Sequence, residues 1–369
     1  MQLNNYRIGN RKKGDSSLLV LAVMLSLFGL LMISSASVVK SFEDFGSNYV
    51  YLSKQTIFFA MGITGLIITS QINYRFWRRW ALWIFLTTVG LLILVKIIGI
   101  SIGGSQRWLN LGFFHLQPSE IMKLSFIIYI AAWLEKAGKD VSTLKKGVIP
   151  FTILFAFAAF LIINQPDLGT TIIVSMTAAI MFTVAGANTS HIISGGSLAL
   201  FIGFLLIRSA EYRWQRFLTF LNPSADLQGA GYQINQALMA IGSGGWLGLG
   251  FGQSMQKYLY LPQVQTDAIF AIIVEELGFA RVIILLLVFA YFTLKGYKIA
   301  KNAPDLFGKL LATGITTWIV FQTLINVGGI MGLIPLTGVP LPFISYGGSS
   351  LVILLCAVGI LYNISREVN

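Results

Sequence analysis

The fold is decided by Tyr260-Leu261-Pro262-Gln263-Val264-Gln265-Thr266-Asp267-Ala268-Ile269-Phe270-Ala271-Ile272-Ile273-Val274-Glu275-Glu276-Leu277-Gly278-Phe279. A long polar loop ends at Asp267, and an apolar helix begins there. The same helix then carries Glu275 and Glu276, roughly 12 to 14 Å further on at a rise of ~1.5 Å per residue. Acids at membrane depth are costly and usually mark a functional site. We therefore interpret the rest of the chain as a frame that holds Asp267 at a membrane surface.

The composition predicts an all-α polytopic membrane protein. Of the 369 residues, 56% are hydrophobic and only 11% are charged, whereas soluble proteins carry about 25% charged residues. The net charge of +12 is explained by basic residues that flank membrane spans on the cytoplasmic side, so we expect no nucleic-acid partner. The single cysteine, Cys356, lies in an apolar run and cannot form an internal disulfide.

The lengths of the apolar runs predict ten transmembrane helices. The predicted spans are 16–39, 51–70, 81–100, 118–135, 147–164, 168–186, 189–208, 268–294, 308–332 and 344–364. We therefore divide the chain into a basic tail (1–15), one membrane domain (16–364) and a short tail (365–369). A large extracytoplasmic loop of about 209–267 separates the seventh and eighth spans, and its apolar helical patches favour partly inserted helices over disorder.

The distribution of basic residues predicts that both termini are cytoplasmic in a multi-pass protein of the cytoplasmic (inner) membrane. With the N-terminus inside, most basic residues cluster in short inner segments. These are Arg7, Arg11, Lys12, Lys13, Arg75, Arg78, Arg79, Lys136, Lys139, Lys145, Lys146, Lys295, Lys298, Lys301, Lys309 and Arg366. The N-terminal apolar run lacks a sensible cleavage site, which indicates an anchor and not a removed signal peptide.

Two acids near the predicted outer surface have both a structural and a functional interpretation. Glu120 follows Pro118 in the first turn of the fourth span, where an acid stabilises the positive helix end. Lys123 lies three residues further on the same face, and either pairs with Glu120 or meets an anionic ligand. Asp167 either caps the next helix or stands beside the same outer cavity as Asp267.

Basic residues on the outer side oppose the positive-inside trend and need a reason. Arginine binds phosphate bidentately, so a group of cations around one carboxylate would suit a substrate with a diphosphate. The alternative for each one is a solvated surface side chain. The candidates are Arg107, Lys123, Arg213, Arg216 and Lys257.

Three further features have open interpretations. The loop glycines lack a dinucleotide-binding spacing and indicate flexible or close-packed backbone. Ser345 follows a proline-rich break, where small hydroxyl residues either pack helices closely or line a cavity. On a helix, Glu275 and Glu276 cannot both share the face of Asp267, so at least one is expected to pair inside the bundle.

These residues together resemble the SEDS (shape, elongation, division and sporulation) family of peptidoglycan glycosyltransferases over nearly the whole chain. The motifs that carry the resemblance are Ser34-Ser35-Ala36-Ser37, Gln106-Arg107-Trp108, Gln117-Pro118-Ser119-Glu120, Gln165-Pro166-Asp167-Leu168-Gly169-Thr170, Gly231-Tyr232-Gln233, Ala240-Ile241-Gly242-Ser243-Gly244-Gly245, Thr266-Asp267, Glu275-Glu276-Leu277-Gly278 and Pro342-Phe343-Ile344-Ser345-Tyr346-Gly347-Gly348-Ser349-Ser350. The segment Gly252-Gln253-Ser254 with Gln256-Lys257 resembles the division branch more than the elongation branch.

The resemblance implies ten spans and polymerisation of lipid II on the outer leaflet, with Asp267 as the catalytic carboxylate. It also implies a class B penicillin-binding protein and division-complex membrane proteins as partners. The chain departs from the family pattern at Gln263, usually a glutamate, and at Gln265, often a histidine. These two amides leave more of the work to Asp267, and a divalent cation, Mg or Mn, stays an open question.

The expected reaction is attack of a sugar hydroxyl on the anomeric carbon of a lipid-linked donor, with inversion. Asp267 would act as the general base, which helps by about 10²–10⁴-fold, and cations would stabilise the leaving diphosphate. Two other functions fit the same sequence. One is a lipid II flippase, although the unexplained charges gather on the outer side and not along the bilayer depth. The other is a division scaffold without activity.

Overall fold

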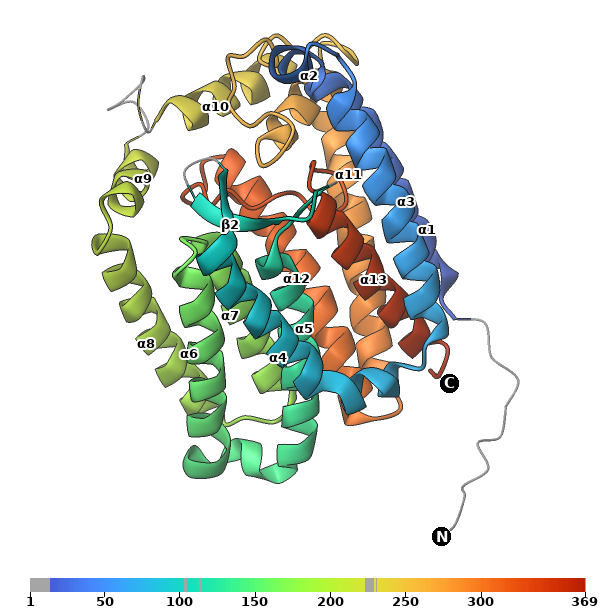
Figure 1. Ribbon diagram of the computed structural model, residues 1–369, viewed down its shortest axis with the longest axis vertical. Coiled ribbons are helices and arrows are strands. Elements are labelled where there is room, and N and C mark those ends of the chain that lie inside the picture. Colours follow the sequence, from blue (N-terminus) through green and yellow to red (C-terminus); the bar gives the residue numbers. More distant parts are fainter. Residues whose placement is uncertain (1–13, 103–104, 113, 223–228, 230, 369) are drawn as a thin grey trace.

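The computed structural model (Figure 1) describes residues 14–102, 105–112, 114–222, 229 and 231–368. Several predicted features lie outside these residues. They are the basic residues Arg7, Arg11, Lys12 and Lys13 of the N-terminal tail, Gly103 and Gly104, the loop residues 223–228 and 230, and Asn369 at the end of the C-terminal tail.

The described chain is built from helices, as the composition predicts. Their bounds are α1 Ser16–Ala36, α2 Val38–Phe45, α3 Val50–Gln71, α4 Tyr74–Ile98, α5 Pro118–Ala137, η1 Gly138–Ser142, η2 Leu144–Val148, α6 Ile149–Ile163, α7 Leu168–Val184, α8 Thr189–Arg208, α9 Glu211–Leu221, α10 Tyr232–Gly244, α11 Ile269–Asn302, α12 Leu306–Ile330 and α13 Gly348–Ser365.

A helix lies at each of the ten predicted spans, but the count of ten spans stays a prediction. Among the described residues, eight helices are long and apolar enough to cross a membrane. The two predicted spans outside this group are α7, with 17 residues, and α5, which carries Glu120, Lys123, Glu135 and Lys136. These eight helices nevertheless show that the chain is a multi-pass membrane protein.

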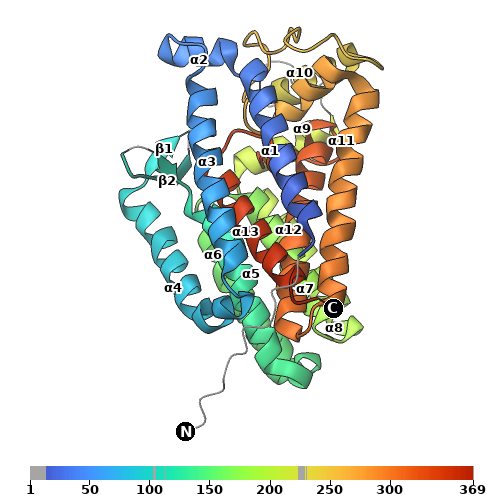
Figure 2. The same ribbon diagram turned by 90° about the vertical axis from the view of Figure 1, so that its right-hand side faces the viewer.

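The helices form a bundle with two distinct ends (Figures 1 and 2). The start of α1 and the end of α13 lie at one end, which we call the terminal end. The helices α2, α9 and α10 lie at the other, which we call the loop end. Most of α12 is buried inside the bundle, whereas α8 buries none of its residues and runs along the edge in Figure 1.

Three short strands near the loop end depart from the all-helical expectation. They are β1 Ile100–Ile102, β2 Ser105–Asn110 and β3 His115–Leu116, and β2 pairs with both neighbours in antiparallel register. Strands this short give almost no alternating pattern for a sequence to reveal. Arg107 belongs to β2, and Figure 1 shows β2 close to the upper end of α4.

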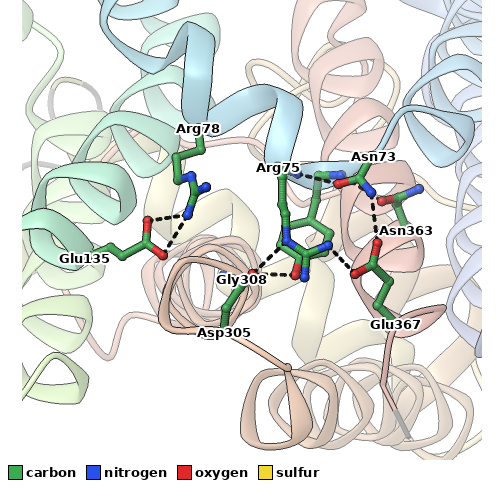
Figure 3. Close-up of polar contacts among 9 residues, drawn as sticks. Asn73, Arg75, Arg78, Glu135, Asp305, Gly308, Asn363 and Glu367 are labelled. Carbon is green, nitrogen blue, oxygen red and sulfur yellow. Dashed lines mark hydrogen bonds and ion pairs between the residues drawn. The ribbon is translucent and has the colours of Figure 1, made fainter. Parts of the chain in front are cut away.

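A polar network fastens several chain segments together at the terminal end (Figure 3). Asp305 caps α12 by accepting from the Gly308 N–H at 2.7 Å, and it also accepts from Arg75 Nε at 3.0 Å and from the Tyr74 hydroxyl at 2.8 Å. Arg75 reaches Glu367 at 2.5 Å. The start of α4 is thereby tied to α12 and to the segment after α13.

Candidate functional site around Asp267

The Asp267 carboxylate is held by a turn that leads directly into α11. The N–H groups of Thr266 and Ala268 donate to the Gln263 carbonyl at 3.0 and 3.3 Å. Asn326 on α12 donates from Nδ2 to the Asp267 carbonyl at 2.8 Å. Asp267 as a whole is half-buried, and its backbone is fixed both by this turn and by α12.

Desolvation dominates the electrostatics of this carboxylate. Burial raises the pKa of Asp267 above its ordinary value of 3.8, against the hydrogen bonds from Thr266 and Gln233 and the charge of Arg216, which lower it. Thr266 Oγ1 lies 3.2 Å from Oδ1, and Gln233 Nε2 lies 3.5 Å from Oδ2. A carboxylate with a raised pKa is a stronger base, which suits proton abstraction near neutral pH.

A cavity of about 520 Å³ is lined by two residues that act on this carboxylate, Gln233 and Arg216, although Asp267 itself is not part of the lining. Its volume lies within the range of about 300–1,000 Å³ typical of ligand pockets. Its walls come from α9, from the start of α10 and from the loops before α11 and after α12. Gln233 belongs both to this wall and to the contacts of Asp267. Among the lining residues are Tyr212, Arg216, Phe220, Tyr232, Gln233 and Pro262.

Of the five predicted cations, the structure brings Arg216 to this cavity. Arg216 lines it, donates to the Leu336 carbonyl at 3.4 Å and acts electrostatically on Asp267. Arg213, on the same helix, instead donates to the Tyr212 hydroxyl at 2.8 Å and to the Leu206 carbonyl at 3.1 Å. Of the two arginines on α9, Arg216 therefore faces the cavity, whereas Arg213 stabilises the junction between α9 and α8.

Arg107 and Asp167 fasten the loop between α6 and α7. Arg107 Nε donates to the Gln165 carbonyl at 2.7 Å, and its guanidinium also donates to the Pro166 carbonyl. Asp167 caps α7 through the Thr170 N–H at 3.1 Å, as the structural interpretation predicts. It also accepts from the Ser119 hydroxyl at 3.1 Å, which joins this loop to α5.

Lys123 and Glu120 form a buried ion pair inside the bundle. Lys123 Nζ lies 2.8 Å from Glu120 Oε1, and the two side chains are 1% and 4% exposed. Lys123 also donates to Gln322 Oε1 at 2.9 Å and faces the Trp318 ring at 5.2 Å. The pairing interpretation of this motif is therefore realised, and the binding role of Lys123 stays a prediction.

Glu275, Glu276 and Lys257 belong to a second polar cluster. Lys257 Nζ lies 3.2 Å from Glu276 Oε1, and both side chains are buried. Ser35 on α1 donates to the same oxygen at 2.6 Å, and Ser254 donates to Glu275 at 2.5 Å. These contacts fasten the loop after α10 onto α11 and α1. Lys257 is thus engaged within the protein, which explains its position without a ligand.

Glycines let this loop enter a break in α11. Gly278 has φ of +79° and a non-helical backbone, and a methyl group there would lie 2.2 Å from the Gly248 nitrogen. The N–H groups of Leu249 and Gly250 donate to the carbonyls of Glu275 and Glu276 at 2.9 and 3.0 Å. The close-packed interpretation is correct for Gly248, whereas some other glycines of the loop have open space around them.

The other candidates support the backbone around Asp267. Ser345 is buried and accepts from the Leu341 N–H at 2.7 Å, so it closes a turn. The Gln265 carbonyl accepts from the Tyr346 N–H at 2.8 Å, and Gln263 Oε1 lies 2.9 Å from Thr266 Oγ1. The two amides that depart from the family pattern therefore lie in the turn that carries Asp267.

The donor set for a metal ion at this site is small. Among the described residues, no group of three or more His, Cys, Asp or Glu side chains comes together. Magnesium is nevertheless often bound by one or two carboxylates, with the remaining ligands from water and substrate phosphates. Asp267 fits that limited role.

Three residues at the site are absent from the candidates drawn from the sequence. Gln233 and Thr266 contact the carboxylate, and Asn326 holds its backbone. Thr266 and Gln233 do occur in the quoted motifs, but only as part of the resemblance. Asn326 has a readable signal, since an amide within a long apolar helix needs a buried partner.

Comparison with known proteins gives the same family as the motifs. The model of the FtsW, RodA and SpoVE family, described as cell cycle proteins, matches residues 15–369. Stage V sporulation protein E of Bacillus subtilis is 42% identical, over 95% of this chain and 97% of its own length. A probable peptidoglycan glycosyltransferase FtsW of Trichlorobacter lovleyi is 40% identical, over 95% of this chain and 93% of its own.

Solved structures share the fold. A chain of a peptidoglycan synthase complex, described as coordinating polymerization and crosslinking, superposes with a TM-score of 0.81 at 26% identity, over 96% of this chain and 98% of that one. The rod shape determining protein RodA of Thermus thermophilus superposes with a TM-score of 0.70 at 25% identity, over 96% and 97%. With motifs, relatives and fold in agreement, this chain belongs to the FtsW/RodA/SpoVE (SEDS) family.

Proposed function

We propose that this chain is a peptidoglycan glycosyltransferase that polymerises lipid II at the outer face of the cytoplasmic membrane. The observation that carries the proposal is the Asp267 carboxylate, which has a raised pKa and is contacted by Gln233, a residue that lines a cavity of about 520 Å³ together with Arg216. Relatives at about 40% identity are named as peptidoglycan glycosyltransferases, which supports the reaction class.

In the proposed reaction, Asp267 accepts the proton of the acceptor sugar hydroxyl as the oxygen attacks the anomeric carbon of the donor. The bond from that carbon to the polyprenyl diphosphate breaks, and a single displacement inverts the anomeric configuration. Gln233 and Thr266 keep the carboxylate oriented. Arg216 stabilises the charge that grows on the departing diphosphate, because a cation that is already in place near the leaving group stabilises its developing charge.

A divalent cation, if bound, would be held by Asp267 and the diphosphate oxygens. It would supply additional positive charge to the leaving group. The steps assigned to Asp267 and Arg216 do not depend on it.

The orientation and partners of the protein follow from the same proposal. The loop end faces outward and both termini are cytoplasmic, which agrees with the basic residues at the terminal end.

We propose a class B penicillin-binding protein as the partner that cross-links the new glycan. The similar chain from a complex that coordinates polymerization and crosslinking supports this choice. Division-complex membrane proteins are the further expected partners, and an elongation role is the alternative.

Reconstitution in liposomes separates this function from lipid transport. The purified protein, with and without a class B penicillin-binding protein, receives fluorescent lipid II in the outer leaflet. We expect glycan chains to accumulate, with no movement of lipid II across the bilayer beyond that in empty liposomes. Translocation without glycan synthesis would instead establish a flippase, and neither activity under both conditions would favour a scaffold.

A further inference from the structure

One face of α12 carries three buried polar side chains that the proposed reaction does not use. Trp318 and Gln322 are 0% exposed, and Asn326 is 3% exposed. A spacing of four residues keeps such side chains on one helix face. Polar side chains inside a membrane bundle are costly unless they are paired, so their partners indicate what this face does.

Two of these side chains hold the segment Gly338–Pro340, which we call the strap. Gln322 Nε2 donates to the Pro340 carbonyl at 2.9 Å. Asn326 Nδ2 donates to the Val339 carbonyl at 2.8 Å and to the Asp267 carbonyl at 2.8 Å. A single amide nitrogen therefore joins the strap to the backbone of the proposed base.

The strap lies directly against the Asp267 carboxylate. Gly338 has φ of +71°, and a methyl group added there would lie 3.8 Å from Asp267 Oδ2. A shift of the strap would therefore change the space around the carboxylate. Because Asn326 holds both segments, loss of its amide would release the strap and the Asp267 backbone together.

The amide of Gln322 has its orientation set by two donors. Its Oε1 accepts from Lys123 Nζ at 2.9 Å and from Trp318 Nε1 at 2.7 Å, so the Nε2 group is left to donate to the strap. Lys123 in turn pairs with Glu120 at 2.8 Å. The buried ion pair on α5 is thereby connected, through Gln322, to the wall of the Asp267 site.

We propose that Asn326 and Gln322 are positioning residues for the reaction, and that they act by fixing the strap and the Asp267 backbone. The inference rests on the proposed function. Small displacements of a reacting group are costly, since a shift of about 1 Å can reduce a rate about 100-fold. Most of the cavity wall comes from α9 and the start of α10, outside the strap, so we expect substrate binding to change less than the rate.

The test compares Asn326→Leu and Gln322→Glu with Thr323→Val in steady-state glycan synthesis from lipid II. We expect Asn326→Leu to lower kcat by roughly 10- to 100-fold, with KM changed less than about threefold. Gln322→Glu keeps the acceptor for Lys123 and Trp318 but cannot donate to Pro340 as a carboxylate, so we expect a smaller loss of kcat. Thr323 donates only within its helix, to the Ile319 carbonyl, and its variant should match wild type.

Combination with Asp267→Asn shows whether Asn326 acts through the base. If it does, Asp267→Asn with Asn326→Leu is no slower than Asp267→Asn alone, because residues that act as a unit are not additive. Multiplicative losses, or a loss confined to KM, would overturn the proposal. So would an Asn326→Leu variant with the kcat of Thr323→Val.

Hydrogen–deuterium exchange tests the positioning without any activity. Peptides that cover the strap and residues 262–268 should exchange faster in Asn326→Leu than in wild type or Thr323→Val. Failure of wild type to make glycan would remove the proposed function, but the exchange rates would still decide whether Asn326 fixes the strap. Equal exchange in all three proteins would overturn the positioning role.

Discussion

Lys257→Met distinguishes a structural lysine from a ligand-binding one. Lys257 Nζ contacts Glu276 Oε1 at 3.2 Å, Ser35 Oγ at 3.2 Å and the Gly252 carbonyl at 2.5 Å. Lys257 and Glu276 are 5% and 0% exposed. Removal of the ammonium group would leave a buried carboxylate without its counter-charge, which typically costs about 3–5 kcal/mol.

Unfolding in mixed micelles with increasing SDS measures this loss of stability. The free energy of unfolding should fall by about 3–5 kcal/mol in Lys257→Met and recover most of that loss in Lys257→Met with Glu276→Gln. Glutamine keeps an acceptor for Ser35, which donates to Glu276 at 2.6 Å. The control is Lys40→Met, which breaks an exposed pair with Glu43 and should cost about 0–1 kcal/mol.

The double variant should also polymerise lipid II within about threefold of wild type, since neither Lys257 nor Glu276 lines the cavity. A Lys257→Met protein that is as stable as wild type but has a raised KM for lipid II would refute the structural role of Lys257. That result would return Lys257 to the cations that bind the diphosphate.

Three further predictions concern pH, charge and backbone. The rate should fall as pH drops through the raised pKa of Asp267, because the base must be deprotonated. The acidic limb of the pH–rate profile should therefore lie above pH 3.8, and a limb at or below that value would contradict the assignment. Arg216→Ala should lower kcat/KM about 10- to 100-fold, which corresponds to the loss of one hydrogen bond to a charged group. It should also shift the acidic limb to higher pH, because the Arg216 charge lowers the pKa of Asp267. Arg213→Ala on the same helix should change kcat/KM less than about threefold. Gly278→Ala should destabilise the fold by at least about 2 kcal/mol, because φ is +79° and a Cβ would meet the Gly248 backbone. Gly242→Ala should be tolerated, because Gly242 has open space around it. Equal unfolding midpoints for the two variants would refute the close packing at Gly278.

The sequence predicts the helices well because apolar length is a strong signal in a membrane protein. It places the start of α11 next to Asp267, and the Asp167 cap and the Glu120–Lys123 pair are local relations that helix spacing makes readable. The helix α10 was also predictable in outline, since Ile234 and Ala237 form an apolar patch and are buried in the structure.

The remaining features depend on contacts between distant segments. Lys257 meets Glu276 only because the loop after α10 enters the break at Gly278, and no local pattern reveals that approach. The expectation of five cations around Asp267 also depended on distant contacts. The sequence indicates on which side of the membrane each cation lies, but not the direction in which its side chain points. The role of Asn326 could not be predicted from α12 alone, because its partner Val339 belongs to the strap, which follows the end of α12.

Glycan synthesis by purified Asp267→Asn protein, at saturating lipid II and beside wild type, measures how far polymerisation depends on the Asp267 carboxylate. Asparagine keeps the shape of the side chain and removes its basicity. We expect kcat to fall at least about 100-fold, which is the lower end of the range for loss of a general base, while lipid II binding is retained. Glycan synthesis by Asp267→Asn at the wild-type rate would contradict the assignment of Asp267 as the base.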